Sequence, residues 1–204
     1  MKKSKATPLL KLNIAITILS IVICISYAIL YLTKNDVFMM ISSMLMILLP
    51  LFVFVLEKII KTRIDETLKL SYLLFILGSG IFGAIGDFYS KVMFYDKLIH
   101  FTSGMFVTVI SIILLERLYK TKINKREFFL LITVINIAVA TTWEIVEFFF
   151  DLIFNKNAQK GNTDTMLDII TAIIGGFFIS IPYIKNYIIS GVNKRVISKG
   201  WFII

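Results

Sequence analysis

Six stretches of mostly apolar residues decide what this chain of 204 residues can fold into. A helix needs roughly 20 such residues to cross the hydrocarbon core of a bilayer. The stretches that qualify cover residues 12–32, 37–56, 70–88, 98–116, 128–150 and 165–184. Hydrophobic residues make up 58% of the chain, more than is usual in soluble domains. Because the connections are short, the sequence predicts an all-α fold, in which residues 1–204 form a single transmembrane domain of six spanning helices.

The first apolar stretch follows a basic segment, an order that also occurs in secretory signal peptides. The stretch is near 20 residues long, longer than a typical signal core, and this length predicts an uncleaved first helix. The only cysteine, Cys24, lies inside the stretch, so the sequence contains no disulfide framework. We expect its thiol to be inert.

The basic residues indicate the orientation of the helices. The formal net charge is +9, and 17 of the 22 Lys and Arg residues fall on one side of the predicted bundle. This side carries Lys2, Lys3, Lys5, Lys11, Lys58, Lys61, Arg63, Lys69, Arg117, Lys120, Lys122, Lys125, Arg126, Lys185, Lys194, Arg195 and Lys199. The other side carries Lys34, Lys91, Lys97, Lys156 and Lys160. Basic residues gather in cytoplasmic loops of membrane proteins, so both termini are predicted to be cytoplasmic and no nucleic-acid partner is expected.

The acidic residues gather on the opposite, outer side, together with the only histidine, His100. Eight of the 13 acidic residues lie there: Asp36, Asp87, Asp96, Glu144, Glu147, Asp151, Asp164 and Asp168. Ionisable groups at membrane depth cost several kcal/mol each, so they belong to functional sites more often than to positions without a function. The sequence therefore points to this side of the bundle as the functional one.

Helical spacing arranges most of these residues in three stripes, since residues three, four or seven apart share a helix face. The stripes are Asp96 with His100, then Glu144 with Glu147 and Asp151, and finally Asp164 with Asp168. Each stripe stands at the outer end of a predicted helix. If the stripes face inward, they form a polar cup that opens outward.

A divalent metal ion is the ligand that such a cup fits best. Carboxylates close together resist ionising at the same time, and a cation relieves their repulsion. Oxygen ligands with one imidazole suit Mg²⁺, Mn²⁺, Ca²⁺ or Zn²⁺, and no organic cofactor is implied. The predicted metal ligands are Asp96, His100, Glu144, Glu147, Asp164 and Asp168. A bound ion can activate water, and His100, Glu144 and Asp168 are the predicted catalytic residues.

Simpler structural roles compete with this interpretation. His100 can be a hydrogen-bonded partner of Asp96, and the outer lysines can neutralise Asp87 or Asp151 as solvated charges at the rim. Asn136 is predicted to make a helix–helix hydrogen bond. The remaining assignments concern interfacial and capping residues. Trp143, Phe148, Phe149 and Phe150 read as an interfacial aromatic belt, and Thr163 and Thr165 as caps of the last helix.

Two sequence segments carry a family resemblance: YDKLIHF (Tyr95 to Phe101) and DTMLDIITAIIGG (Asp164 to Gly176), together with the glutamates of the fifth helix. They resemble the YjdF-type family of uncharacterised bacterial membrane proteins and, more distantly, the VanZ-like proteins associated with glycopeptide (teicoplanin) tolerance. The resemblance covers about residues 70–184. It implies a multi-pass protein of the bacterial plasma membrane.

The resemblance also implies which positions correspond to family elements. Asp96, Lys97 and His100 match a D-K-x-x-H element. Glu144 or Glu147 would match the helix-borne acid, and Asp168 with Gly175 the Asp and Gly of the last helix. The chain has Ala172 where the VanZ-like pattern usually has Asn, which favours the YjdF-type assignment. The resemblance supplies a location for the site and no established reaction.

Three classes of function remain open. The first is a metal-assisted enzyme acting on a lipid-linked or cell-envelope substrate, with membrane lipids as its surroundings. All four arginines, Arg63, Arg117, Arg126 and Arg195, fall on the predicted cytoplasmic side, which leaves no arginine to hold a phosphate. The second is a non-catalytic envelope or stress protein. The third is a cation- or proton-coupled transporter. A transport path needs polar groups through the bilayer, and the deep parts of the first two helices carry few of them. The oligomeric state is left open.

Overall fold

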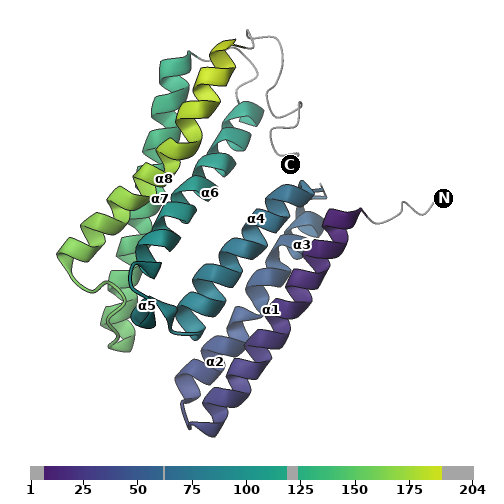
Figure 1. Ribbon diagram of the computed structural model, residues 1–204, viewed down its shortest axis with the longest axis vertical. Coiled ribbons are helices and arrows are strands. Elements are labelled where there is room, and N and C mark those ends of the chain that lie inside the picture. Colours follow the sequence, from purple (N-terminus) through teal and green to yellow (C-terminus); the bar gives the residue numbers. More distant parts are fainter. Residues whose placement is uncertain (1–6, 62, 119–123, 190–204) are drawn as a thin grey trace, which may run out of the picture. The chain divides into compact units, whose positions relative to one another are not determined.

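The computed structural model describes residues 7–61, 63–118 and 124–189, apart from the side chains of Ile60, Arg117 and residues 186–189, and every regular element in this range is a helix (Figure 1). Six helical segments are long and apolar enough to cross a membrane: Pro8–Thr33, Val37–Ile59, Glu66–Ile85, Tyr95–Glu116, Lys125–Phe154 and Asn162–Lys185. Each contains or overlaps one of the predicted stretches. The all-α fold and the six spanning helices are confirmed.

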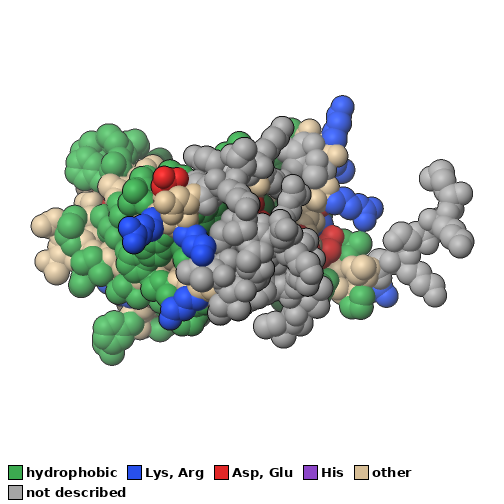
Figure 2. Space-filling model, turned by 90° about the horizontal axis from the view of Figure 1, so that it is seen from above, with side chains coloured by type: hydrophobic (Ala, Val, Ile, Leu, Met, Phe, Trp, Pro, Cys, Tyr) green, Lys and Arg blue, Asp and Glu red, His purple; other side chains and the backbone are tan. Residues whose placement is uncertain are grey.

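Two compact units make up the chain, Met1–Tyr95 and Asp96–Ile204. The single transmembrane domain expected from the short connections stays a prediction. Eight of the basic residues used for the topology lie outside the described residues: Lys2, Lys3, Lys5, Lys120, Lys122, Lys194, Arg195 and Lys199. Among the described residues, Lys and Arg side chains project from the face seen in Figure 2, amid hydrophobic side chains.

Unit 1 consists of α1 (Pro8–Thr33), α2 (Val37–Met46), α3 (Leu48–Ile60), α4 (Glu66–Ile76), the π-helix η1 (Leu77–Ile85) and the short α5 (Phe88–Lys91). Side chains cap three of these helices, because Thr7, Asp36 and Asp65 each accept a hydrogen bond from a backbone N–H in the first turn. The second span is interrupted between α2 and α3. Pro50 explains the position, since its ring crowds the carbonyl four residues earlier, at Met46, where α2 ends.

The third span changes from α-helix to π-helix at Leu77. This stretch contains Gly78, Gly80 and Gly83, and glycine lowers the preference of a chain for a regular α-helix. Its wider hydrogen bonding is visible at the end, where the Gly86 N–H donates to the Ile81 carbonyl at 2.8 Å. The helix ends before Asp87, which is in the left-handed region with φ of 62°. The predicted third helix therefore stops short of Asp87.

A buried ion cluster ties three helices of unit 1 together, and we name it the Lys69 cluster (Asn13, Glu57, Glu66 and Lys69). The Lys69 side chain is 2% exposed, and its Nζ lies 3.0 Å from Glu57 Oε1 and 2.7 Å from Glu66 Oε1. Each glutamate has a further donor, namely the Ile64 N–H for Glu57 and the Asn13 amide for Glu66. These contacts join α1, α3 and α4 at one end of the unit.

Unit 2 contains α6 (Tyr95–Leu118, apart from its first residue), α7 (Lys125–Phe154) and α8 (Asn162–Ile189). Asn124 caps α7 by accepting the Arg126 N–H at 3.1 Å. An apolar core lies toward the end of the unit where α7 begins, and it consists of Ile112, Leu115, Phe128, Ile132 and Tyr183. The polar residues with functional potential lie at the opposite end.

Glycines bring the backbones of α6 and α8 into direct contact. A Cβ atom placed on Gly104 would lie 1.8 Å from the Ala172 carbonyl oxygen, and one on Gly175 would lie 2.0 Å from the Phe101 carbonyl oxygen. Only glycine fits at these two positions, because small residues are what allow membrane helices to approach so closely. The two contacts fix the spacing of α6 and α8 next to the polar end.

Candidate functional site

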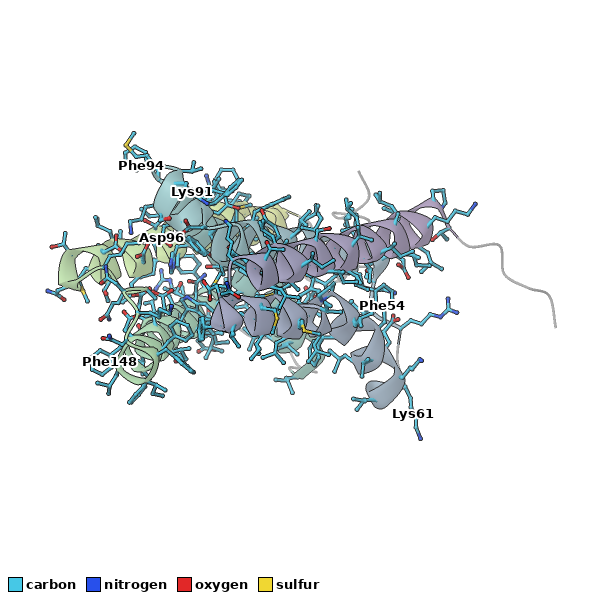
Figure 3. The ribbon with its side chains drawn as sticks, turned by 90° about the horizontal axis from the view of Figure 1, so that it is seen from below. Phe54, Lys61, Lys91, Phe94, Asp96 and Phe148 are labelled. Atoms are coloured by element: carbon cyan, nitrogen blue, oxygen red, sulfur yellow. The ribbon has the colours of Figure 1, made fainter. Side chains whose placement is uncertain are left out.

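The first turns of α6 present Asp96, Lys97 and His100. The spacing of four residues puts Asp96 and His100 on one face, as predicted, and the His100 ring is 6% exposed. The next turn is held by Ser103, whose hydroxyl donates to the His100 carbonyl at 2.8 Å. Figure 3 shows Asp96 at this end of the helix.

The last turns of α7 present Glu144 and Glu147. Buried residues recur on this helix at every fourth position, and the strip ends at Glu144, which is 3% exposed. Glu147 is half-buried and accepts a hydrogen bond of 2.7 Å from the Trp143 indole. Trp143 and Phe148 are exposed, as an interfacial belt requires, and Phe148 projects outward from α7 (Figure 3).

The first turns of α8 present Asp164, Thr165 and Asp168, of which Asp168 is 1% exposed. The helix is entered through Gly161, whose carbonyl accepts the Thr165 N–H at 3.1 Å. The Thr165 hydroxyl is buried and has no hydrogen-bond partner among the described residues, so the prediction that this side chain caps the helix is wrong. Burial directs it into the unit instead.

Side chains from all three helices converge on His100. Its Nε2 lies 3.6 Å from Asp96 Oδ1, 3.6 Å from Asp168 Oδ1 and 3.9 Å from Glu144 Oε1. The potential ligand atoms form two sets, and within each set they lie within 4.8 Å of one another. One set comes from Asp96, His100 and Asp168, and the other from His100, Glu144 and Glu147. These five residues are named the His100 cluster. The predicted inward-facing stripes of α6, α7 and α8 therefore meet.

Lys97 and Lys160 neutralise part of the cluster's surroundings. Lys97 Nζ lies 2.5 Å from Asp164 Oδ1 and 2.7 Å from Asp168 Oδ1. Lys160, on the loop before α8, places its Nζ 3.0 Å from Asp96 Oδ2. Asp164, predicted as a metal ligand, is held by Lys97 and does not belong to either set of potential ligand atoms.

Glu144 is the member of the cluster that the protein leaves unsatisfied. Both of its carboxylate oxygens are buried without a hydrogen-bond partner among the described residues. The Thr165 hydroxyl, which likewise has no geometric hydrogen bond among the described residues, lies close enough to interact with this carboxylate. A buried carboxylate normally has partners, and an exception calls for an explanation such as a bound ion.

The distances around His100 suit one small cation. Two ligand atoms that bind one ion at about 2.1 Å with a tetrahedral angle lie roughly 3.4 Å apart. The three carboxylate oxygens lie 3.6 to 3.9 Å from His100 Nε2, so small side-chain movements bring them to that spacing. The set supplies one nitrogen and up to four carboxylates from three helices, an arrangement used for metal sites in helix bundles.

The remaining outer acids have local structural roles. Asp151 accepts the N–H groups of Ala158 and Gln159, at 2.6 and 3.0 Å, and so anchors the loop between α7 and α8. Asp36 caps α2. Asp87 belongs to unit 1, where the Ser90 hydroxyl and the Lys91 ammonium group contact it. The hydrogen bond from Ser90, aided by Lys91, lowers the pKa of Asp87 from its ordinary value.

Asn136 lies on the same strip of α7, two turns from Glu144. Its amide donates to the Gly104 carbonyl and to the Thr108 hydroxyl, both at 2.9 Å, which confirms the predicted helix–helix hydrogen bond. The Asn136 contacts and the backbone contact of Gly104 with Ala172 together form a closely packed layer on the inner side of the His100 cluster. This layer is the floor of the cup.

The sequence interpretation missed three contacts of the site and one cluster elsewhere. It placed Lys97 in the D-K-x-x-H element without naming a partner, treated Lys160 only as a general neutralising charge, and treated Trp143 only as a belt residue. The spacing of four between Trp143 and Glu147 was a usable signal for their hydrogen bond. The Lys69 cluster was missed because Lys69 was taken only as a sign of topology.

Comparisons with known proteins agree with this architecture. Residues 14–185 match the family described as "Predicted membrane protein (DUF2238)". A protein of Thermotoga maritima named "Uncharacterized protein" is 31% identical over 123 residues, which are 60% of this chain and 64% of that relative. The matched region thus spans less than two thirds of the relative's length. No solved structure matches the chain. The family model covers most of the chain, including all three helices of the His100 cluster, and the protein therefore belongs to this family of membrane proteins.

Proposed function

We propose that the His100 cluster binds a divalent metal ion, and that this multi-pass membrane protein uses the ion at the outer face of the bacterial plasma membrane. The observation that carries the proposal is the unpartnered, buried carboxylate of Glu144 beside His100 Nε2, at 3.9 Å. An uncompensated buried charge costs several kcal/mol, and a cation bound by Glu144, His100 and Asp168 would remove that cost.

The donor set favours particular ions. Imidazole suits transition metals such as Zn²⁺, whereas carboxylates also suit Mn²⁺, Mg²⁺ and Ca²⁺. The cluster combines one imidazole with carboxylates, so Zn²⁺ and Mn²⁺ are the expected ions. Asp164 is proposed to act through Lys97 and not as a ligand, because it belongs to neither set of potential ligand atoms, whereas Asp168, which Lys97 also contacts, belongs to one.

The use of the ion that fits this site best is metal-assisted hydrolysis of a lipid-linked or cell-envelope substrate. A bound ion supplies Lewis acidity and a water of lowered pKa. Glu147 is half-buried and is oriented by the Trp143 indole, so it is placed to take a proton. His100, Glu144 and Asp168, the predicted catalytic residues, would then act by holding the ion.

The packed floor argues against the alternative of a transporter. A transport path has to continue past the cluster, whereas the backbones of α6 and α8 touch at Gly104 and Ala172 directly beyond it. The family membership supports the YjdF-type assignment that the D-K-x-x-H element suggests. The more distant VanZ-like resemblance contributes no function to this proposal.

Metal analysis of detergent-purified protein tests the proposal. We expect about one ion per chain in the wild type after incubation with Zn²⁺ or Mn²⁺, and almost none in Glu144→Gln or Asp168→Asn. Glu127→Gln is the matched control, because Glu127 is an exposed glutamate on the same helix and its variant should load as the wild type does. Equally low metal in all four proteins would overturn the proposal.

The orientation is tested by thiol labelling. A cysteine at Asn157, which is exposed on the loop between α7 and α8, is introduced into a Cys24→Ser background. With both termini cytoplasmic, a membrane-impermeant reagent should label this cysteine in intact cells. Labelling that requires permeabilised cells would place the cluster on the cytoplasmic side and contradict the outward orientation.

A further inference from the structure

We infer that a short apolar segment of unit 1 inserts into the membrane lipid and lies at the boundary between headgroups and acyl chains. The segment consists of Val92, Met93 and Phe94, and we name it the apolar tip. It follows α5 and precedes α6 along the chain. The inference concerns none of the residues of the His100 cluster and does not depend on a bound metal ion.

All three side chains of the apolar tip are exposed. Val92 is 44% exposed, Met93 79% and Phe94 70%. Figure 3 shows Phe94 projecting away from the helices, near Lys91. A contiguous run of large apolar side chains exposed to this degree is unfavourable in water, and such a surface normally contacts a membrane or another apolar partner.

Two residues in the left-handed region of backbone conformation bracket the segment that carries the tip. Asp87, with φ of 62°, precedes α5, and Phe94, with φ of 63°, precedes α6. An aromatic residue rarely adopts this conformation, because its Cβ atom crowds the backbone. Such a turn persists only where the surrounding structure holds it in place.

Aromatic side chains hold the segment on the π-helix η1. The Phe88 ring stacks on Phe82 with a centroid distance of 5.7 Å, and the Tyr95 ring packs edge-on against Phe88 at 5.4 Å and against Tyr89 at 5.7 Å. The Tyr95 hydroxyl donates a hydrogen bond of 2.9 Å to the Gly78 carbonyl. The segment therefore packs its rings on both sides of the tip against unit 1, while the tip itself stays outside.

The neighbouring spans identify lipid as the partner of the apolar tip. Only nine residues, 86–94, join the end of η1 at Ile85 to the start of α6 at Tyr95, and α5 takes up four of them. So short a link keeps the tip close to the ends of two helices long enough to span a membrane. Headgroups and acyl chains meet at this depth.

The residues around the apolar tip suit the same depth. Tyr89 and Tyr95 have amphipathic rings, which are frequent at membrane interfaces. The Lys91 side chain is 63% exposed, so its ammonium group can reach the headgroups while its methylene groups lie along apolar surface. Interfacial segments of membrane proteins likewise place apolar side chains just below the headgroups. The tip thus anchors the chain in lipid where α6 begins.

Spin labels on single cysteines test the insertion in full-length protein, in nanodiscs of phosphatidylcholine and phosphatidylglycerol. Met93→Cys and Phe94→Cys are each made in a Cys24→Ser background and labelled with a nitroxide. Collisions of the label with oxygen, which concentrates in lipid, and with a nickel chelate, which stays in water, are measured by electron paramagnetic resonance. Val22→Cys, exposed in the middle of α1, is the control for lipid, and Asn157→Cys, exposed on the loop between α7 and α8, is the control for water.

The ratio of oxygen collisions to nickel collisions decides the outcome. We expect the ratio at Met93 and Phe94 to be several-fold higher than at Asn157 and to lie between the values of the two controls. A ratio equal to that at Asn157 would place the tip in water and overturn the inference. Few collisions with either reagent would mean that protein, either unit 2 or a second copy of the chain, covers the tip, which also overturns it. Because Phe94→Cys changes the residue in the left-handed turn, Met93→Cys decides if the two labels disagree.

Discussion

The Lys69 cluster of unit 1 and the His100 cluster of unit 2 are built from the same kinds of side chain and differ in how completely their charges are matched. Lys69 contacts both Glu57 and Glu66, and each of these glutamates accepts a further hydrogen bond. Around His100 the carboxylates outnumber the lysines, and Glu144 has no hydrogen-bond partner in the part of the chain that the structure describes. Both clusters lie near helix ends, so position alone does not distinguish them.

The difference indicates what each cluster is for. A buried ion group with partners for its charged atoms is suited to holding helices together, whereas an excess of buried carboxylate is costly without a ligand. One atom qualifies this contrast, since Asn13 Oδ1 in the Lys69 cluster is also buried and has no partner among the residues described. That atom is uncharged, so it costs far less than the Glu144 carboxylate. The comparison therefore fits a structural role for the Lys69 cluster and supports the proposal that the His100 cluster binds a ligand.

The largest effect is expected at Lys69. Replacing Lys69 with Met leaves Glu57 and Glu66 without their shared cation, and breaking a buried ion pair costs about 3 kcal/mol or more. The loss should appear as a thermal midpoint several degrees lower in detergent, whether or not a metal ion is added. Lys58→Met, at an exposed position on α3, is the control and should change stability by less than about 0.5 kcal/mol. A Lys69 variant as stable as the control would break the comparison.

Asp168 and Asp164 are expected to separate a ligand from a residue that acts through Lys97. Asp168→Asn should weaken Zn²⁺ or Mn²⁺ binding more than about 100-fold, whereas Asp164→Asn should weaken it about tenfold, as removal of an outer partner does. Competition with a fluorescent chelator measures both values. Equal losses in the two variants would return Asp164 to the ligand set that the sequence predicts.

Glu144 should show the opposite sign to Lys69. In metal-free protein, Glu144→Gln removes an unpartnered buried charge and is expected to raise stability by about 1 kcal/mol. Added metal should stabilise the wild type by about 2.7 kcal/mol at 100 times the dissociation constant and leave the variant unchanged. Thermal unfolding in detergent, with a chelator or with metal, measures both effects. Destabilisation of the metal-free variant would mean that Glu144 has a structural partner after all.

The smallest effect is expected at Asp87, which is exposed at the edge of unit 1. Its pKa is lowered in the folded protein, so its contribution is present above the ordinary aspartate pKa, about 3.9, and is lost as the pH falls through the lowered value. Ser90→Ala removes the main cause of the shift. Because the Asp87 side chain is half exposed, Ser90→Ala should lower the free energy of unfolding by less than about 0.5 kcal/mol at pH 7, and by less still under acid conditions. Thermal midpoints of the wild type and the variant, taken from pH 7 down to acid conditions, measure the effect.

The helices and the three polar stripes could be predicted because they depend on local sequence. The apolar lengths identify six spans, and the spacing of Asp96 and His100 or of Glu144 and Glu147 puts each pair on one helix face. The break between α2 and α3 falls inside one predicted apolar stretch, residues 37–56, because apolar length does not register a local interruption of a helix. The π-helix at Leu77–Ile85 could not be foreseen, since glycines permit several helix types and packing selects one.

The partners of each charge could not be predicted, because they come from distant parts of the chain. Asp164 and Asp168 share a stripe, yet Lys97 takes Asp164 away from His100 through a contact 67 residues apart in sequence. Asp151 shares the stripe of Glu144, yet the loop amides occupy it. The sequence around Lys69 does not distinguish it from other basic residues near a helix start, because its cluster is completed by Glu57 of α3 and Asn13 of α1.

The contact of Gly104 with Ala172, and of Gly175 with Phe101, has a consequence for which ions the proposed site would accept. Backbone atoms that already touch cannot move closer, and a helix cannot shift outward without losing its packing. The spacing of α6 and α8 is therefore set by backbone contact, and side-chain movements adjust the distances across the cluster only within that limit. Ca²⁺ binds oxygen at about 2.3 to 2.6 Å and needs six to eight ligands, whereas Mg²⁺ and Zn²⁺ bind at about 2.0 to 2.2 Å. We expect the two glycines, which lie outside the proposed ligand set, to favour Zn²⁺ and Mg²⁺ over Ca²⁺ by fixing the spacing of α6 and α8.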